Sequence, residues 1–431
     1  MTDGLPETAD AHARREAEVR HLLNGFEEEL ADWAEAARAR GPLEKHQSQI
    51  ESAVRVIAGA LEQLRSLPDA ERHRKAPELV LDLHHLWDFF RTKLTVRHIP
   101  RYQRFLAVAD ELAWSVYDPV RRAAAMARPG LREPPLTFLS RHPVPFAAAR
   151  GSDFEELLTS GKQRTLAGRR ASGYLPFPVI GIPWSASHHL PALLAVAHET
   201  GHHIEDDFGL AEPLRTRLRE HAGLPAERID VWEPWLGEVF ADVCATLACG
   251  EAYVRTLADA LAATPVTAHA TGDYPPPRLR LLVCRAALIT AGAHVPPDLP
   301  GAIDPDDEEA PAVVNALIGV GFRELGGASL ASLIGLRNST QLTEASRRLC
   351  TGLRTKRNDV PGVLAAAALA FLDAPDAYDV QAVGMRAQNE ALSLVPKGPR
   401  AASATEKLLV ARDSAAGLAL FGLLDADASE S

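Results

Sequence analysis

Residues 198–202 of this chain read His-Glu-Thr-Gly-His, and this HExxH segment constrains the fold more than any other feature. It follows an apolar run at residues 190–197, and the two together predict a buried helix. Residues four positions apart lie on the same face of a helix, so His198 and His202 present two imidazoles in one direction. Such a pair can bind one zinc ion, with Glu199 beside it. A catalytic zinc site needs a third ligand, which must come from elsewhere in the chain.

The residues before the motif favour a helix but leave an alternative. Ser187 can cap the helix by accepting a hydrogen bond from a backbone N–H, and Pro191 falls in the first turn, where a missing N–H costs little. The chain has 16 histidines, so a chance match to so short a motif is a real alternative. The segment would then be a core helix that carries two paired histidines.

A second apolar helix is predicted at residues 235–248, with Pro234 at its start. Glu238 is a carboxylate within this apolar segment, and burial of an unpaired carboxylate is costly. Binding to a metal ion removes that cost, so Glu238 is the expected third ligand. Asp242 lies on the same face and can accept the second ring N–H of a ligand histidine. The alternative is a pair of solvated charges on an amphipathic face.

The HExxH motif followed by Glu238-x-x-x-Asp242 resembles the pattern of the gluzincin metallopeptidases, a family that includes thermolysin. Residues 238–242, Glu-Val-Phe-Ala-Asp, are similar to the ExxAD signature of the branch that contains the CAAX prenyl endopeptidases and the HtpX-type proteases. Residues 274–280 are similar to the His-Pro…Arg segment of that branch, with Tyr274 where the branch usually has histidine. The membrane spans typical of the branch are missing. The resemblance runs from the apolar strand before His198 through Arg280.

The resemblance implies a role for each matched residue. One zinc ion per chain is expected, bound by His198, His202 and Glu238. Glu199 is expected to be the general base and acid that moves protons between water and the leaving amine. Asp242 would orient a ligand histidine, and Arg280 would be a buried charge partner. The transition-state oxyanion would be stabilised by Tyr274 or Arg280, since a phenol stays protonated at neutral pH and can donate a hydrogen bond.

A short strand is predicted at residues 177–183, just before the motif helix. Prolines bracket this strand, which is typical of a sheet edge. An edge strand beside the metal would bind an extended peptide by strand addition. Residues 136–139 are a second β-type run and could pair with residues 179–182.

Composition narrows the class of protein. The net charge of −11 over 431 residues argues against sequence-independent binding to nucleic acid, which needs a concentrated basic surface. The first residues show no secretory signal, and the longest apolar stretch, residues 363–372, is too short to span a membrane. The four cysteines form no CxxC pair, which is typical of reduced thiols in a cytoplasmic protein.

The predicted fold class is α+β and predominantly helical. A zincin-like catalytic unit with a small mixed or antiparallel sheet is expected at residues 134–295, after a helical N-terminal region at residues 1–133. Residues 296–311 are rich in proline and acidic residues and predict a linker or an exposed loop. Helical patterns at residues 312–431 predict a C-terminal helical region.

These observations favour a cytoplasmic zinc-dependent endopeptidase whose partner is a peptide or protein substrate. Two alternatives stay open. In the first, the metal site is degenerate or purely structural, and the protein has a regulatory or interaction role. In the second, the site is catalytic, but the enzyme is an exopeptidase or hydrolyses a small amide.

Overall fold

The computed structural model describes residues 9–127, 133–149, 176–263, 274–301, 307–335, 339–400 and 406–427. By its internal contacts the chain forms two compact units. The first comprises Met1–Pro100, Arg150–Phe177 and Lys397–Ser431, and the second comprises Arg101–Ala149 and Pro178–Pro396. The predicted fold class, α+β and predominantly helical, is confirmed, because helices dominate the described residues around one small sheet.

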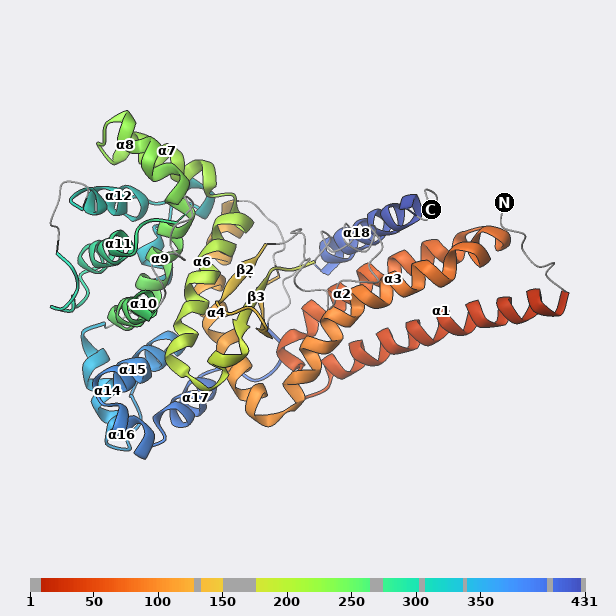
Figure 1. The fold of residues 1–431 in the computed structure, drawn as a ribbon, viewed down its shortest axis with the longest axis horizontal. Helices are drawn as coiled ribbons and strands as arrows, with labels where there is room; N and C mark the ends of the chain where they lie inside the picture. The colour runs from red at the N-terminus through yellow and green to blue at the C-terminus, as the bar shows by residue number, and fades with distance from the viewer. Residues whose placement is uncertain are drawn as a thin grey trace. The chain divides into compact units, whose positions relative to one another are not determined.

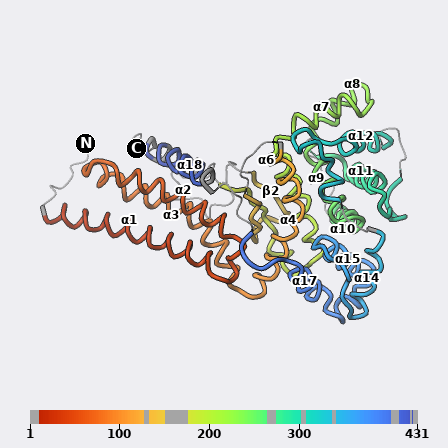
Figure 2. The backbone as a smooth tube through the Cα atoms, turned by 180° about the vertical axis from the view of Figure 1, so that it is seen from behind, coloured from red at the N-terminus to blue at the C-terminus, as the bar shows by residue number. Residues whose placement is uncertain are grey.

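Long helices build the first unit, and Figures 1 and 2 both show them lying side by side. The first two helices are separated by a break, because one helix ends at Arg38 and the next begins at Gln47. The helices are α1 (Ala9–Arg38), α2 (Gln47–Ser66), α3 (Asp69–Thr95) and α18 (Glu406–Asp427), with 3-10 turns at Glu44–His46 and Val96–His98.

A buried carboxylate joins the C-terminal helix to this bundle. Asp413 of α18 is fully buried and accepts hydrogen bonds from Ser52 and Arg55 of α2, at 2.9 Å each. α18 therefore packs with the N-terminal helices, although a single C-terminal region at 312–431 is expected from the sequence. Helix α3 begins at Asp69, so Pro77 lies inside the helix.

The second unit holds the sheet and the remaining helices. Its elements up to the motif are α4 (Pro100–Ala127), β1 (Leu136–Ser140), β2 (Phe146–Ala148), β3 (Val179–Pro183), 3-10 turns at Trp184–His188 and Leu190–Leu194, and α6 (Ala195–Phe208). Next come α7 (Ala211–His221), α8 (Ala226–Trp232), a 3-10 turn at Glu233–Trp235, α9 (Leu236–Cys249), α10 (Glu251–Ala263) and α11 (Pro277–Thr290).

The last part of this unit is also helical. It contains α12 (Glu309–Ile318), α13 (Leu330–Ile334), α14 (Leu342–Cys350), α15 (Val360–Asp373), α16 (Pro375–Val380) and α17 (Val383–Ser393), with 3-10 turns at Arg323–Leu325 and Ser339–Gln341. Helix α15 is almost completely buried, as its continuous apolar sequence predicts. Among the described residues, none of the helices has the length and apolar character needed to cross a membrane.

The sheet has the strand order β1-β3-β2, and β3 is its central strand. β3 pairs in parallel with β1, from Leu136 opposite Val179 onward, and antiparallel with β2. The predicted pairing of residues 136–139 with 179–182 is confirmed, but the prediction that β3 is an edge strand is wrong. Pro178 precedes the strand and Pro183 is its last residue, so neither proline removes a hydrogen bond from the middle of the ladder. Strand addition of a peptide to β3 is therefore excluded.

The described residues of the acidic segment at 296–311 make specific contacts with other elements, unlike a flexible linker. Asp307 is buried and accepts hydrogen bonds from Arg278 at 3.0 Å. Glu309 begins α12 and accepts from Arg228 and Trp232 of α8, each at 2.7 Å. These carboxylates hold helices together, and residues 302–306 lie outside the described residues.

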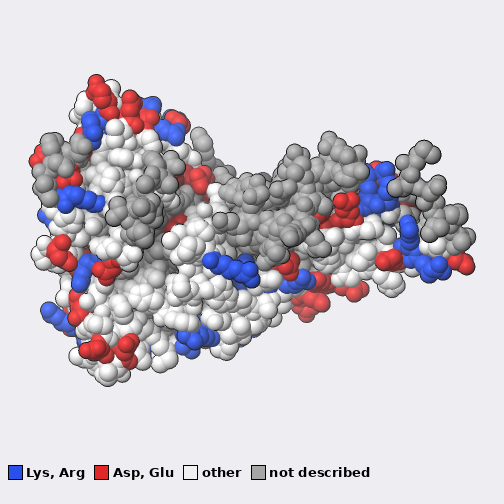
Figure 3. Space-filling model, in the orientation of Figure 1, with Lys and Arg blue, Asp and Glu red and all other residues white. Residues whose placement is uncertain are grey.

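Charged side chains are scattered over the described surface. On the face drawn in Figure 3, Lys and Arg alternate in small groups with Asp and Glu. No extended area of one sign is visible on the described part of this face.

Candidate metal centre

The HExxH residues lie on α6, which follows a 3-10 turn and contacts the sheet through His203. The apolar run before the motif begins as the 3-10 turn Leu190–Leu194, and α6 follows without a break. Ser187 is not the helix cap that was predicted, because α6 starts after Leu194 and no side chain caps it. In the second half of the helix, His203 is fully buried and its Nε2 lies 3.1 Å from the backbone oxygen of Val179. This contact holds α6 against the central strand (Figure 1).

Glycine at position 201 lets α6 and α9 approach closely. A Cβ atom at Gly201 would lie 2.7 Å from the Cα of Ala241 and 3.2 Å from the Cβ of Cys244, both on α9. The first distance is shorter than any van der Waals contact, and its partner is a backbone atom that no rotamer change can move. The motif therefore sits where the two helices cross with their backbones almost in contact.

This crossing brings together the three predicted metal ligands. The Nε2 atoms of His198 and His202 lie 3.2 Å apart. The two carboxylate oxygens of Glu238 lie 3.4 Å from these nitrogens, Oε2 from His198 and Oε1 from His202. His198 is buried, and the side chains of His202 and Glu238 are 24% and 14% exposed. A small solvent-facing opening therefore remains at the cluster.

The spacing of these atoms fits a zinc ion. Ligand atoms about 2.1 Å from zinc at tetrahedral angles lie about 3.4 Å from one another. Oε2 of Glu238 is buried and has no hydrogen-bond partner among the described residues. A buried polar atom without a partner is rare and points to a missing ligand or ion. Two imidazoles and one carboxylate are also the donor set of known catalytic zinc sites.

Asp242 fixes the orientation of the His198 ring. Its Oδ1 lies 2.9 Å from Nδ1 of His198 and accepts a hydrogen bond from the Tyr253 hydroxyl at 2.6 Å. Arg280 donates to both oxygens of Asp242, from Nε at 2.7 Å and from a terminal nitrogen at 2.8 Å. With Nδ1 donating to Asp242, the Nε2 lone pair of His198 faces His202 and Glu238, as metal binding requires.

The protonation states of the cluster follow from burial and from its charged neighbours. Burial acts to raise the pKa of Glu238, but the contacts with His198 and His202 outweigh it and lower that pKa to about 2. Burial also acts to raise the pKa of Asp242, but the charge and hydrogen bonds of Arg280 hold it well below its usual range. Both carboxylates are therefore ionised at neutral pH.

Two other groups of the site, His198 and Glu199, have raised pKa values. Burial acts to lower the pKa of His198, but the contacts with Asp242 and Glu238 outweigh it and raise that pKa to about 10. Burial raises the pKa of Glu199, and the neighbouring His198 and His202 only partly oppose this. A carboxylate with a raised pKa is better matched to accepting and returning a proton near neutral pH than an ordinary one.

Charge balance also favours a cation at this cluster. Glu199, Glu238 and Asp242 contribute three negative charges when ionised, and Arg280 contributes one positive charge. The difference, 3 − 1 = 2, is the charge that one divalent ion supplies. Without an ion, the raised pKa of His198 supplies part of the missing positive charge as a proton.

Two tyrosines bear on the site, and sequence reasoning named only one of them. Tyr274 lies just before α11 and is 46% exposed, and its role as an oxyanion donor stays a prediction. The phenol that reaches the cluster is Tyr253 of α10, whose oxygen lies 3.2 Å from Nδ1 of His198. Gly250, with φ of 62°, makes the tight turn that returns the chain from α9 to α10 and so places Tyr253 beside Asp242. No motif in the sequence marks Tyr253.

The cysteines near the site pack in the core. Cys244, Cys249 and Cys284 are free and buried, and burial raises the pKa of each thiol. A buried neutral thiol behaves as a small apolar side chain.

Comparison of the chain with protein-family models, with curated protein sequences and with solved structures finds no match. The chemistry of the site therefore rests on its own geometry.

Replacing Asp242 by asparagine tests the role of the residues behind the metal ligands. We expect Asp242→Asn to weaken zinc binding about 10- to 100-fold, because His198 loses its orienting acceptor and Arg280 loses its buried partner. The measurement is zinc competition against a chromophoric chelator. Asp207→Asn is the matched control, because Asp207 is a buried carboxylate of α6 that bonds Tyr117. Equal zinc affinity in both variants would remove Asp242 from the site.

Proposed function

We propose that this protein is a zinc-dependent hydrolase that cleaves peptide bonds. One observation carries the proposal: the Nε2 atoms of His198 and His202 and the oxygens of Glu238 lie 3.2–3.4 Å apart at the crossing of α6 and α9. These are the separations and the donor types of a three-ligand zinc site. The similarity of residues 198–280 to the gluzincin pattern supports the same reading.

Glu199 and Asp242 have separate roles in the proposed reaction. Zinc at such a site acts as a Lewis acid and allows water to ionise near neutral pH. Glu199 takes the proton that water loses as its oxygen attacks the carbonyl carbon of the substrate. The same carboxyl group then returns this proton to the amide nitrogen as the C–N bond breaks, so the products are a carboxylic acid and an amine. Asp242 keeps His198 in the tautomer that leaves Nε2 free.

Arg280 and Tyr274 have different parts in this scheme. Arg280 makes two hydrogen bonds to Asp242 and lies 3.7 Å from Oε2 of Glu238. Both of its anionic partners belong to the cluster, so Arg280 positions the ligands. Hydrogen bonding to the oxyanion by Arg280 or by the partly exposed Tyr274 stays a prediction.

Glu199 favours a catalytic zinc site over a purely structural one. It is buried beside the cluster, yet it is not one of the three clustered ligands. A structural zinc site is closed by four protein ligands and has no use for a buried base. The three-ligand arrangement leaves a coordination position for water.

Metal removal is the direct test of this function. We expect turnover of casein to be abolished by 1,10-phenanthroline and restored by stoichiometric zinc, because the proposed reaction depends on zinc to allow water to ionise near neutral pH. Zinc binding without any hydrolysis would instead indicate a structural or regulatory site. A peptide blocked at both ends separates the substrate classes, since an endopeptidase cleaves it and an exopeptidase does not.

A further inference from the structure

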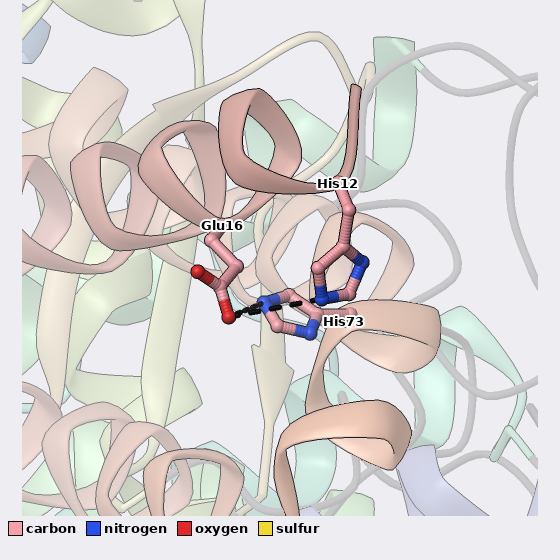
Figure 4. A group of neighbouring side chains, drawn as sticks. All are labelled: His12, Glu16 and His73. Carbon is pink, nitrogen blue, oxygen red and sulfur yellow. Dashed lines mark ion pairs between the residues drawn. The ribbon is translucent and has the colours of Figure 1, made fainter. Parts of the chain in front are cut away.

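A second group of metal-binding side chains lies in the helical first unit, away from the HExxH motif in sequence. It consists of His12 and Glu16 on α1 and His73 on α3. Figure 4 shows the three side chains pointing toward one another from the two helices. His12 and Glu16 are four residues apart, so they lie on one face of α1. Every ligand atom of the group lies within 4.8 Å of the others.

The distances within this group are those of a shared ion and not of direct hydrogen bonds. The nearer carboxylate oxygen of Glu16 is 3.7 Å from Nε2 of His73 and 3.9 Å from Nε2 of His12. Both distances exceed a hydrogen bond, which for nitrogen and oxygen is about 2.7–3.2 Å. Both come within about half an ångström of the 3.4 Å separation of tetrahedral zinc ligands. His12 is 55% exposed and can move by that amount.

His73 is the more buried of the two histidines. Its side chain is only 13% exposed; its Nε2 faces Glu16, and its other ring nitrogen, Nδ1, is buried with no hydrogen-bond partner among the described residues. Burial of an imidazole without a partner is costly, and a histidine kept for packing alone can be replaced by an apolar residue at lower cost. The rings of His12 and His73 are 5.2 Å apart and edge to face, so both can turn a nitrogen to one point.

The surroundings of the group leave room for an ion. Glu16 and His73 line a cavity of about 260 Å³ that Arg20, Arg65 and Arg72 also line. Arg65 is paired with Glu27, and Arg72 is bonded to Asp69, so these two positive charges are already neutralised. Among the described residues, no ion pair joins Glu16 to Arg20, Arg65 or Arg72, so its carboxylate is available to a cation.

We propose that His12, Glu16 and His73 form a second metal site, for zinc or a similar divalent transition metal, that links the first two turns of α1 to α3. Two imidazoles and a carboxylate suit these metals, whereas calcium and magnesium prefer oxygen ligands alone. The sequence predicts one ion per chain, and this site raises the number to two. Its role is to fasten the N-terminal end of α1, which extends to Ala9.

Metal stoichiometry tests this proposal on the full chain. After equilibration with buffered micromolar free zinc, we expect two ions in the wild type and one in the His12→Gln/His73→Gln double variant. His21→Gln is the matched control, because His21 is exposed on the same helix, and it should keep two. His202→Ala should also lose one ion, but the other one. The two proposals therefore fail separately: His202→Ala reports on the HExxH site, and the double variant reports on this one.

A second measurement shows where the ion acts. In the His202→Ala background, zinc should slow amide hydrogen exchange in the first turns of α1, and the His12→Gln/His73→Gln changes should abolish that effect. If the double variant folds poorly, His12→Gln alone can be used in its place, because it alters only an exposed side chain. Equal zinc content in the wild type and the double variant would overturn the proposal. The proposal would also be overturned if inorganic phosphate alone slowed amide hydrogen exchange in α1 to the same extent. That result would indicate that the arginine-lined cavity binds an anion.

Discussion

Glu199→Gln should abolish hydrolysis while leaving zinc content unchanged. Glu199 is buried beside the three candidate metal ligands but is not one of them. Glutamine keeps its size and loses only the ability to accept and return a proton. Loss of a general acid and base slows a reaction by about 10²- to 10⁴-fold. We therefore expect kcat for casein to fall by at least about 10²-fold. The measurements are turnover and zinc content of the same preparation.

A carboxylate on the same helix provides the control for this variant. Asp206 lies on the exposed side of α6, and Asp206→Asn makes the same change of charge close to the site. That variant should retain turnover. If Glu199→Gln hydrolyses casein at the wild-type rate, Glu199 has no part in proton transfer and the proposed mechanism is wrong.

Gly201→Ala should destabilise the protein and weaken zinc binding, although alanine is the better helix former. In an exposed helix interior this change gains about 0.5–1 kcal/mol. At position 201 the new methyl group would lie 2.7 Å from the Cα of Ala241, so α6 and α9 must separate. Overpacking of this kind costs about 1–3 kcal/mol. Separation of the helices also moves Glu238 away from His198 and His202.

Gly25 provides the comparison, because it lies inside α1 with nothing within 4 Å of an added Cβ. Thermal unfolding should show Gly25→Ala more stable than the wild type and Gly201→Ala less stable. Zinc affinity should fall only in Gly201→Ala. A Gly201→Ala variant that is stabilised and binds zinc normally would show that the close helix crossing does not build the site.

Much of the candidate site follows from local sequence patterns. The HExxH spacing fixes which face of α6 carries His198 and His202, because that face is a property of the helix alone. The position of Glu238 in an apolar helix also suggests a buried partner, since an isolated carboxylate would not be tolerated there. The structure places all three within one cluster, as the sequence predicts. Their binding of zinc stays a prediction.

Other features depend on contacts between distant parts of the chain. Tyr253 reaches Asp242 only because the chain turns back at Gly250, and no periodicity in α10 marks this residue. The central position of β3 depends on two separate partners, β1 and β2, whereas its prolines suggested an edge. The contact of Asp413 with Ser52 joins residues at opposite ends of the sequence, so the membership of α18 in the first unit could not be read locally.

The central claim is that His198, His202 and Glu238 bind one ion at the crossing of α6 and α9. Anomalous scattering at the zinc absorption edge, recorded from crystals of the zinc-loaded protein, tests it most directly. We expect a peak about 2.0–2.2 Å from Nε2 of both histidines and from an oxygen of Glu238, with water in the remaining position. A zinc-loaded crystal with no peak between these side chains, or with Glu238 turned away from the ion, would contradict the account.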